Sequence, residues 1–195
     1  QAKIRQQGAA LAALGKDGAD GFDLMARRVG SGDPDNMEAQ AARRYWPLLF
    51  GTDFRRDREA PGINAMLNYG YAVLRAATAR AVCGAGLHPA IGLNHKSEDM
   101  ALIDDLMEPF RPMIDLLVFR AVDAGHKGVT KDTKRYLASV ASVDMQTERG
   151  RTPVFTCLER LAQSLARSCE RGKPELDFPL APLPLELPAP PEPAA

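Results

Sequence analysis

The sequence predicts an all-α protein, and three observations support this fold class. Apolar residues recur at helical spacing through most of the chain. Clusters of Gly, Pro and Asp interrupt these stretches as connections between helices do, and we find no convincing alternation of polar and apolar residues of the kind that marks a strand. With 195 residues, 45% of them hydrophobic, the chain can bury one substantial core or two small ones.

The apolar spacing places the expected helices in order along the chain. They span 2–14, 20–29, 35–49, 61–85, 98–121, 131–146 and 153–170. The stretch from Ile63 to Val82 is apolar on nearly every face, which predicts a helix in the middle of a bundle. Its polar residues Asn64, Asn68 and Tyr71 share one face. Because buried amides need partners, these residues form either a hydrogen-bonded core network or part of a functional site.

The chain divides by composition into a helical domain, 1–173, and a proline-rich tail, 174–195. The tail holds eight of the 15 prolines, which predicts disorder. It also carries four acidic and no basic residues, which leaves 25 basic against 21 acidic residues in 1–173. This excess is compatible with nucleic acid binding. Since the first helix starts without a start signal, we expect an N-terminally truncated chain; we expect no membrane span, because no apolar run is long enough.

Glu38 lies on the apolar side of the expected helix 35–49. The residues three, four, seven and eleven positions further on are Ala41, Ala42, Tyr45 and Leu49. A carboxylate on that side has to be paired, hydrogen-bonded or bound to metal. The alternative is a capping box, with Asp35 at the N-cap and Glu38 three residues later.

An acidic patch interrupts the expected helix 98–121. Asp104, Asp105 and Glu108 lie at neighbouring helical positions, where like charges repel. The only nearby base in the sequence is Arg111, whose alternative role is a salt bridge to Glu108. A divalent cation would relieve the repulsion more effectively.

His95 precedes this helix in a loop. A lone loop histidine is most often a surface residue, but a neutral imidazole beside carboxylates forms a mixed nitrogen and oxygen ligand set. Such a set suits Mn²⁺, whereas Mg²⁺ prefers oxygen ligands alone.

Several motifs, in the same order, resemble the CRISPR adaptation integrase family. They are the Glu-Ala-Gln-Ala-Ala-Arg-Arg-Tyr-Trp run at 38–46, the Gly-Ile-Asn-Ala-Met-Leu-Asn-Tyr-Gly-Tyr run at 62–71, the Gly-Leu-His-Pro-Ala-Ile-Gly-Leu-Asn-His run at 86–95 and the Asp-Leu-Met-Glu-Pro-Phe-Arg-Pro run at 105–112. The likeness extends from the first residues to about Arg171. It implies the helical catalytic lobe of that family, whose N-terminal β-rich domain is apparently missing here.

The resemblance also implies the site. Matched motif by motif, the metal ligands of the family correspond to Glu38, His95 and Glu108, and Asp105 matches a further acid at or near the metal. These four residues are therefore the expected catalytic group, with Mn²⁺ or Mg²⁺ as the cofactor. The implied reaction inserts new spacers into a CRISPR array by transesterification, in which a DNA 3′-hydroxyl attacks a phosphodiester.

The expected partners are double-stranded DNA (the prespacer and the CRISPR repeat), a second copy of the chain and a small second adaptation protein, in the cytoplasm. Binding of DNA phosphates requires basic side chains. The DNA-binding candidates are Arg55, Arg56 and Arg58, ranked first because they lie on a loop between helices of the site, and then Arg43, Arg44 and Lys96. Two alternatives stay open: a truncated, non-catalytic DNA-binding or assembly module of the same family, and an unrelated metal-dependent helical hydrolase.

Overall fold

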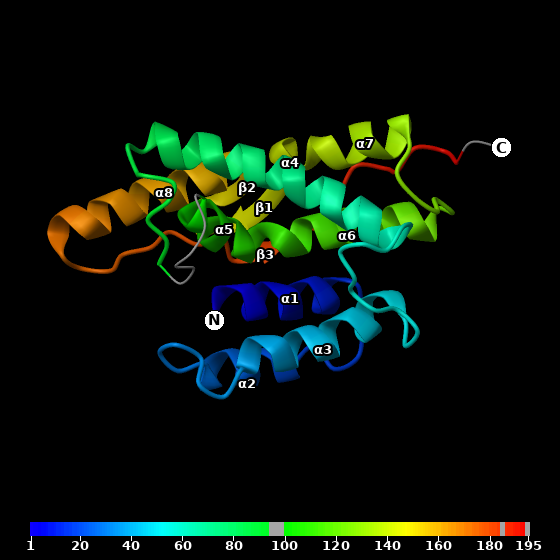
Figure 1. Ribbon diagram of the computed structural model, residues 1–195, viewed down its shortest axis with the longest axis horizontal. Coiled ribbons are helices and arrows are strands. Elements are labelled where there is room, and N and C mark those ends of the chain that lie inside the picture. Colours follow the sequence, from blue (N-terminus) through cyan, green and yellow to red (C-terminus); the bar gives the residue numbers. More distant parts are fainter. Residues whose placement is uncertain (94–99, 184–185, 194–195) are drawn as a thin grey trace.

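A computed structural model describes residues 1–93, 100–183 and 186–193. The described part is mostly helical and includes a small β-sheet (Figure 1). The α-helices are α1 (Ala2–Ala13), α2 (Gly21–Arg28), α3 (Met37–Phe50), α4 (Ile63–Gly84), α5 (Ala101–Met107), α6 (Arg111–Asp123), α7 (Lys131–Ala138) and α8 (Val154–Arg171). The 3-10 turns are η1 (Glu108–Phe110) and η2 (Ser139–Ser142), and the strands are β1 (Asp144–Thr147), β2 (Gly150–Pro153) and β3 (Ala181–Pro182).

The sheet corrects the all-α prediction. Its strand order is β2-β1-β3, and β1 pairs antiparallel with both neighbours. The expected helix 131–146 ends instead at Ala138, and its last residues form β1. Met145 and Thr147 are buried while Asp144 and Gln146 are less so, which is an alternation too short to stand out in the sequence. That the N-terminal β-rich domain of the family is missing here stays a prediction.

The expected single helix 98–121 is broken in two. Proline lacks a backbone N–H, so Pro109 and Pro112 cannot donate to the helical hydrogen-bond ladder. The chain instead makes the turn η1 between α5 and α6. Glu108 is therefore placed at the start of this turn rather than in the middle of a helix.

Two hydrophobic cores lie on opposite sides of α1. Ile4 and Leu11 pack with α2 and α3 in the smaller core, whereas Ala10 belongs to the larger core around α4, α6 and α8. Figure 1 shows the α1–α3 layer lying along one side of the α4–α8 bundle. Within the described residues, none of the helices has both the length and the apolar character that crossing a membrane requires.

The proline-rich segment has a defined path in its described residues, although its composition predicts disorder. Its proline residues offer no N–H groups, but its carbonyl groups accept hydrogen bonds from side chains of the bundle. The donors include Gln6 to the Pro179 carbonyl at 2.9 Å, Arg120 to the Leu187 carbonyl at 3.0 Å and Tyr136 to the Pro188 carbonyl at 3.1 Å. Strand β3 and buried Leu187 add further contacts. The domain boundary near residue 173 stays a prediction.

The close approach of α4 and α6 depends on Gly70. A Cβ atom at this position lies 2.4 Å from Ile114 Cγ2, and Ile114 is fully buried. We therefore expect Gly70→Ala to lower the free energy of unfolding by about 1–3 kcal/mol, as overpacked cores do. Gly84→Ala is the matched control on the same helix, because nothing lies within 4 Å of its Cβ position. Urea unfolding of both variants measures the effect, and equal stabilities would contradict this account of the α4–α6 contact.

Candidate metal and nucleic-acid site

Asp33 determines how the helix that carries Glu38 begins. Its carboxylate accepts hydrogen bonds from the Met37 and Glu38 backbone N–H groups, both at 2.9 Å. The N-cap residue is Asn36, in a left-handed conformation, and its side chain makes no capping hydrogen bond. The capping-box interpretation, with Asp35 at the N-cap, is therefore wrong. The Glu38 carboxylate is not used to cap its own helix and turns instead towards α1.

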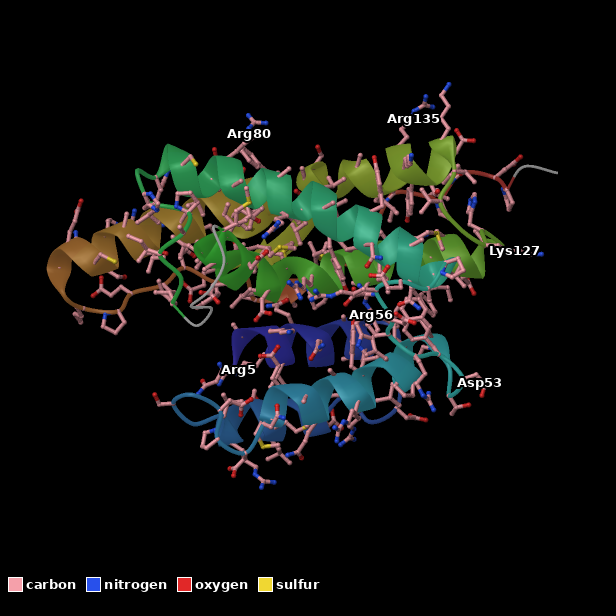
Figure 2. All side chains as sticks on the ribbon, in the orientation of Figure 1. Arg5, Asp53, Arg56, Arg80, Lys127 and Arg135 are labelled. Atoms are coloured by element: carbon pink, nitrogen blue, oxygen red, sulfur yellow. The ribbon has the colours of Figure 1, made fainter. Side chains whose placement is uncertain are left out.

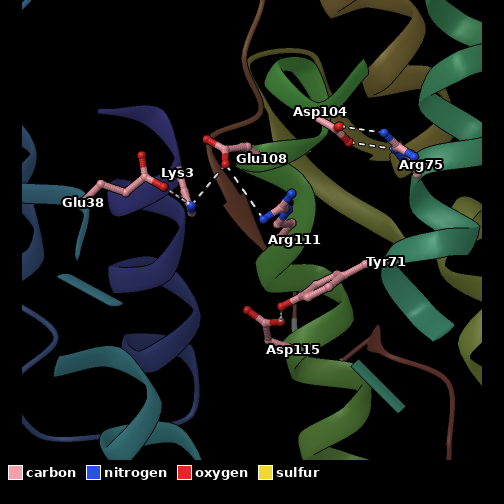
Figure 3. Close-up of polar contacts among 8 residues, drawn as sticks. All are labelled: Lys3, Glu38, Tyr71, Arg75, Asp104, Glu108, Arg111 and Asp115. Carbon is pink, nitrogen blue, oxygen red and sulfur yellow. Dashed lines mark hydrogen bonds and ion pairs between the residues drawn. The ribbon is translucent and has the colours of Figure 1, made fainter. Parts of the chain in front are cut away.

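The carboxylates of Glu38 and Glu108 meet at the same positive charge. The Lys3 ammonium of α1 forms an ion pair with Glu38 Oε1 and a second, at 3.2 Å, with Glu108 Oε1 (Figure 3). The Glu108 and Lys3 side chains are 17% and 18% exposed, whereas that of Glu38 is 44% exposed, so the contact lies at the edge of solvent. Carboxylate oxygens from α3 and η1 thus converge on one cation. This cation is the Lys3 ammonium, which occupies the position that a metal ion between the two carboxylates would take. The donor set therefore fits a cation site.

The acidic patch at 104–108 is neutralised by bases that are remote in sequence. Arg75 of α4 binds Asp104 in a bidentate pair, with N–O distances of 2.8 and 2.7 Å. Arg111 lies 3.8 Å from Glu108, which is the local salt bridge considered as an alternative. The expectation that Arg111 is the nearby base was thus incomplete, because tertiary packing brings Lys3 and Arg75 to the same patch (Figure 3).

Asp105 holds the loop that leads to the predicted histidine ligand. Its Oδ2 accepts a hydrogen bond from the Leu93 backbone N–H at 2.6 Å. His95 and Lys96 lie outside the described residues. Among the residues that are described, no group of three or more His, Cys, Asp or Glu side chains is placed to hold a metal ion. The structure brings Glu38 and Glu108 together at Lys3. The full ligand set of Glu38, His95 and Glu108 stays a prediction.

Glu38, Asp105 and Glu108 line a cleft of about 640 Å³, here called the acidic cleft. The remaining walls come from the start of α1, the loop before α3 and the C-terminal segment. Apolar side chains of α8 and that segment, such as Leu165 and Phe178, face the same space.

A second cleft, of about 520 Å³, opens on the other side of Lys3. Its charged lining consists of Lys3, Arg56, Arg58, Arg75 and Arg111 against Asp104 and Asp115. This basic cleft has the character of a phosphate-binding surface. Lys3 lines both clefts, so the acidic and basic surfaces adjoin at its side chain.

Two amides of α4, buried Asn64 and half-buried Asn68, hold the arginine loop in place. Asn64 accepts a hydrogen bond from Arg56 at 2.9 Å, and Asn68 accepts one from the same guanidinium at 2.6 Å. Asn64 and Asn68 also donate to the carbonyl groups of Arg55 and Arg58. The hydrogen-bonded network expected of these residues therefore exists, and it orients Arg56. Figure 2 shows Arg56 between the two layers, whereas Arg80 and Arg135 project from the outer surface.

The other DNA-binding candidates are placed less favourably. Arg55 folds back onto the carbonyl groups of Thr52 and Phe54, at 2.6 and 2.9 Å. Arg44 binds the Gly18 carbonyl at 3.0 Å and lies over the Phe22 ring. Arg43 is exposed on α3, and among the described lining residues of the two clefts neither Arg43 nor Arg44 appears.

Asp115 anchors three helices behind the basic cleft. Its two oxygens accept hydrogen bonds from Tyr71 of α4 at 2.5 Å and Tyr45 of α3 at 3.0 Å. Burial raises the pKa of the Asp115 carboxyl from 3.8 to about 7, although the two tyrosine hydroxyls and the charges of Arg111 and Arg56 act to lower it. Burial and the adjacent carboxylate also raise the pKa of both tyrosines.

Sequence reasoning missed Lys3, Arg75 and Asp115. The sequence offered one weak signal for Asp115, a charged residue within the apolar stripe of α6, where burial without partners is costly. Lys3 and Arg75 sit in otherwise ordinary helical patterns. Their roles follow from contacts with α3, α5 and η1 that no local spacing indicates.

Comparison with known proteins identifies the family. The sequence profile described as CRISPR associated protein Cas1 matches residues 35–146, which contain all four predicted catalytic residues. The chain belongs to the Cas1 family. The resemblance found in the sequence is thereby confirmed, and Lys3 lies outside the matched segment.

This chain spans about half the length of the curated Cas1 proteins that it matches. The CRISPR-associated endonuclease Cas1 of Neisseria meningitidis serogroup C (strain 8013) is 39% identical over 155 residues, which cover 74% of this chain and 51% of that protein. The CRISPR-associated endonuclease Cas1 2 of Pyrobaculum aerophilum is 31% identical over 138 residues, covering 67% and 46%.

Solved structures share the Cas1-like fold. A casposase bound to an integration product has a TM-score of 0.74 at 24% identity, over 91% of this chain and 60% of that chain. A chain of a Cas6-RT-Cas1–Cas2 complex has a TM-score of 0.69 at 16% identity, over 91% and 24%. At such identities the likeness concerns the fold alone.

The buried carboxyl of Asp115 predicts a specific pH dependence of stability. Its folded pKa of about 7 lies above the ordinary value of 3.8, so between these pH values the native state keeps a proton that the unfolded state has lost. This group therefore makes the free energy of unfolding fall as pH rises from about 4 to 7. Asp115→Asn keeps an acceptor and a donor for the tyrosines but does not titrate.

We expect the difference in free energy of unfolding between Asp115→Asn and the unmodified protein to grow by about 1 kcal/mol or more from pH 5 to pH 8, in favour of the variant. The reason is that one pKa unit corresponds to about 1.4 kcal/mol. Urea unfolding at both pH values measures this difference. The two proteins should differ least at pH 5, and a constant difference across the range would contradict a raised pKa at Asp115.

Proposed function

We propose that this Cas1 chain carries the catalytic site of a metal-dependent DNA endonuclease and integrase that inserts new spacers into a CRISPR array. The observation that carries the proposal is the convergence of Glu38 and Glu108 on a cation, directly beside a basic cleft. A site that joins DNA strands needs both features, because it has to hold a metal and the phosphates around the reacting bond.

Mn²⁺ or Mg²⁺ is the proposed cofactor, held by Glu38, His95 and Glu108. The imidazole favours Mn²⁺ over Mg²⁺, because Mg²⁺ prefers oxygen ligands. When bound, the ion supplies charge neutralisation at the phosphoryl oxygens and promotes ionisation of the attacking 3′-hydroxyl. Asp105 acts as a positioning residue, since its carboxylate holds the backbone at Leu93, two residues before His95.

The residues of the basic cleft bind the DNA backbone in this proposal. Arg56 is pre-oriented by two amides, so it loses little conformational freedom when it contacts a phosphate. Arg58 and Arg111 add charge on the same surface. The proposed partners are double-stranded DNA, a second copy of the chain and a small second adaptation protein, in the cytoplasm. The solved Cas6-RT-Cas1–Cas2 complex supports a partner of this last kind.

Substitution of the ligands tests the catalytic assignment. We expect Glu38→Ala, His95→Ala and Glu108→Ala each to lower the Mn²⁺-dependent strand-transfer and cleavage rates by more than about 100-fold, since even residues that only orient metal ligands are worth about 10- to 100-fold. The measurement is a gel assay on a labelled prespacer duplex and a repeat-containing plasmid.

Glu170→Ala is the matched control, because Glu170 is an exposed glutamate of α8. Full activity of Glu38→Ala and His95→Ala with Mn²⁺ would show that the site is wrongly assigned. DNA binding without any Mn²⁺ binding or strand transfer would favour the non-catalytic assembly module instead.

The basic cleft predicts a change in the salt dependence of DNA binding. We expect the double variant Arg56→Ala/Arg58→Ala to bind duplex DNA more weakly, with the slope of log affinity against log salt reduced by about two, because each lost phosphate contact removes about one. Arg167→Ala/Arg171→Ala removes the same charge from exposed positions of α8. Fluorescence anisotropy at several salt concentrations distinguishes the two pairs, and equal slopes would remove the basic cleft from the DNA-binding surface.

A further inference from the structure

Lys3 has a position that neither the family motifs nor the proposed mechanism explains. It extends from the first turn of α1 to the space between Glu38 and Glu108, and it contacts the Oε1 atom of each (Figure 3). Its side chain is only 18% exposed. Lys3 is therefore built into the site and is not a surface residue that happens to lie near an acid.

The ammonium group and a metal ion compete for the same oxygens. Two carboxylates that contact the same group repel each other unless a positive charge lies between them; Lys3 provides that charge, and Arg111 adds a second one 3.8 Å from Glu108. A divalent cation held between Glu38 and Glu108 takes the position of the ammonium group, which contacts both carboxylates. The two cations cannot share one position, so metal binding requires the Lys3 ammonium to leave.

The basic cleft can receive the displaced Lys3 side chain. Lys3 also lines the basic cleft, together with Arg56, Arg58 and Arg111. An ammonium group entering that cleft alone meets like charges, which is unfavourable. A phosphate group in the cleft reverses the sign of this interaction and gives the ammonium a partner.

We propose that Lys3 is an exchangeable internal cation that couples metal binding to phosphate binding. In the metal-free protein it neutralises the Glu38–Glu108 pair. When metal binds, it moves to the basic cleft and becomes a further ligand of a DNA phosphate. By linkage, each of metal and DNA then strengthens the binding of the other. This inference rests on the proposed function, since it takes Glu38 and Glu108 as metal ligands.

Mn²⁺ affinity is the first test. We expect Lys3→Met to bind Mn²⁺ about tenfold more tightly than the unmodified protein in isothermal titration without DNA, because the competing cation is gone and coupling of this kind is typically worth about 5- to 150-fold. Arg5→Met is the matched control: Arg5 lies on the same helix and lines the acidic cleft, but it pairs with Asp23. Lys3→Arg keeps the charge and should retain the weaker affinity.

Selective acetylation provides a readout on the unmodified protein, independent of how well any variant folds. We expect saturating Mn²⁺ to raise the acetylation of Lys3 severalfold in mass spectrometry, relative to exposed Lys131, because the ammonium is released from its two carboxylates. Addition of a prespacer duplex should then protect Lys3 again. Unchanged or reduced acetylation of Lys3 with Mn²⁺ would overturn the exchange.

Glu38→Ala separates failure of this inference from failure of the proposed function. If Mn²⁺ binding depends on Glu38 but Lys3→Met binds no more tightly than Arg5→Met, the metal site stands and the role of Lys3 is wrong. If neither the unmodified protein nor Lys3→Met binds Mn²⁺, both proposals fail. Tighter binding by Lys3→Met that is abolished by adding Glu38→Ala supports both.

Discussion

Helix α1 has to satisfy two hydrophobic cores at once, and the rest of the structure depends on this constraint. One side of α1 packs with α2 and α3, and the other side contacts α6, η1 and β3. The candidate site lies at the seam between these layers, because Lys3 of α1 draws Glu38 from the small layer and Glu108 from the bundle to one position. Packing of the α1–α3 layer against the α4–α8 bundle therefore also brings Glu38 and Glu108 together.

The placement of the second carboxylate depends on a break in the helical ladder. Pro109 and Pro112 interrupt the ladder, so that α5 ends and the chain continues through η1 into α6. This break leaves Glu108 facing α1, while Asp104, one turn earlier, faces Arg75 of α4. Asp105 accepts a hydrogen bond from the Leu93 backbone N–H, at the entry to the loop that carries the predicted histidine. The three acids of one short segment thus serve three different partners.

The acidic and basic clefts differ in how their charges are fixed. In the basic cleft, neutral amides orient Arg56: Asn64 and Asn68 bind its guanidinium, and buried Asp115 lies nearby. Arg56 is thus oriented by neutral amides, whereas Arg75 and Arg111 of the same cleft pair with Asp104 and Glu108. In the acidic cleft, Glu38 and Glu108 are already paired with Lys3. In the exchange that we propose, a metal entering this cleft displaces Lys3, and the adjoining basic cleft receives the displaced side chain.

Helical periodicity determined most of the fold in advance. The long apolar run of α4, the amphipathic pattern of α8 and the Gly and Pro connections are local features, and the helices form where these features predict. The sheet escaped notice because β1 is four residues long and because β3 comes from the proline-rich segment, whose pairing depends on a distant strand. Apolar spacing alone predicts one helix over 98–121, whereas the prolines at 109 and 112 divide it into α5 and α6.

The sequence by itself determined the family, because the order of the motifs is a property of the chain alone, and it predicted the acidic residues of the candidate site. Only the tertiary structure decided what neutralises those acids. The partners of Glu38, Asp104 and Asp115 come from other helices, and no spacing along the chain encodes such contacts. The physical reason is that electrostatic pairing depends on distance in space. Lys3 therefore became a functional candidate only once packing had brought it between Glu38 and Glu108.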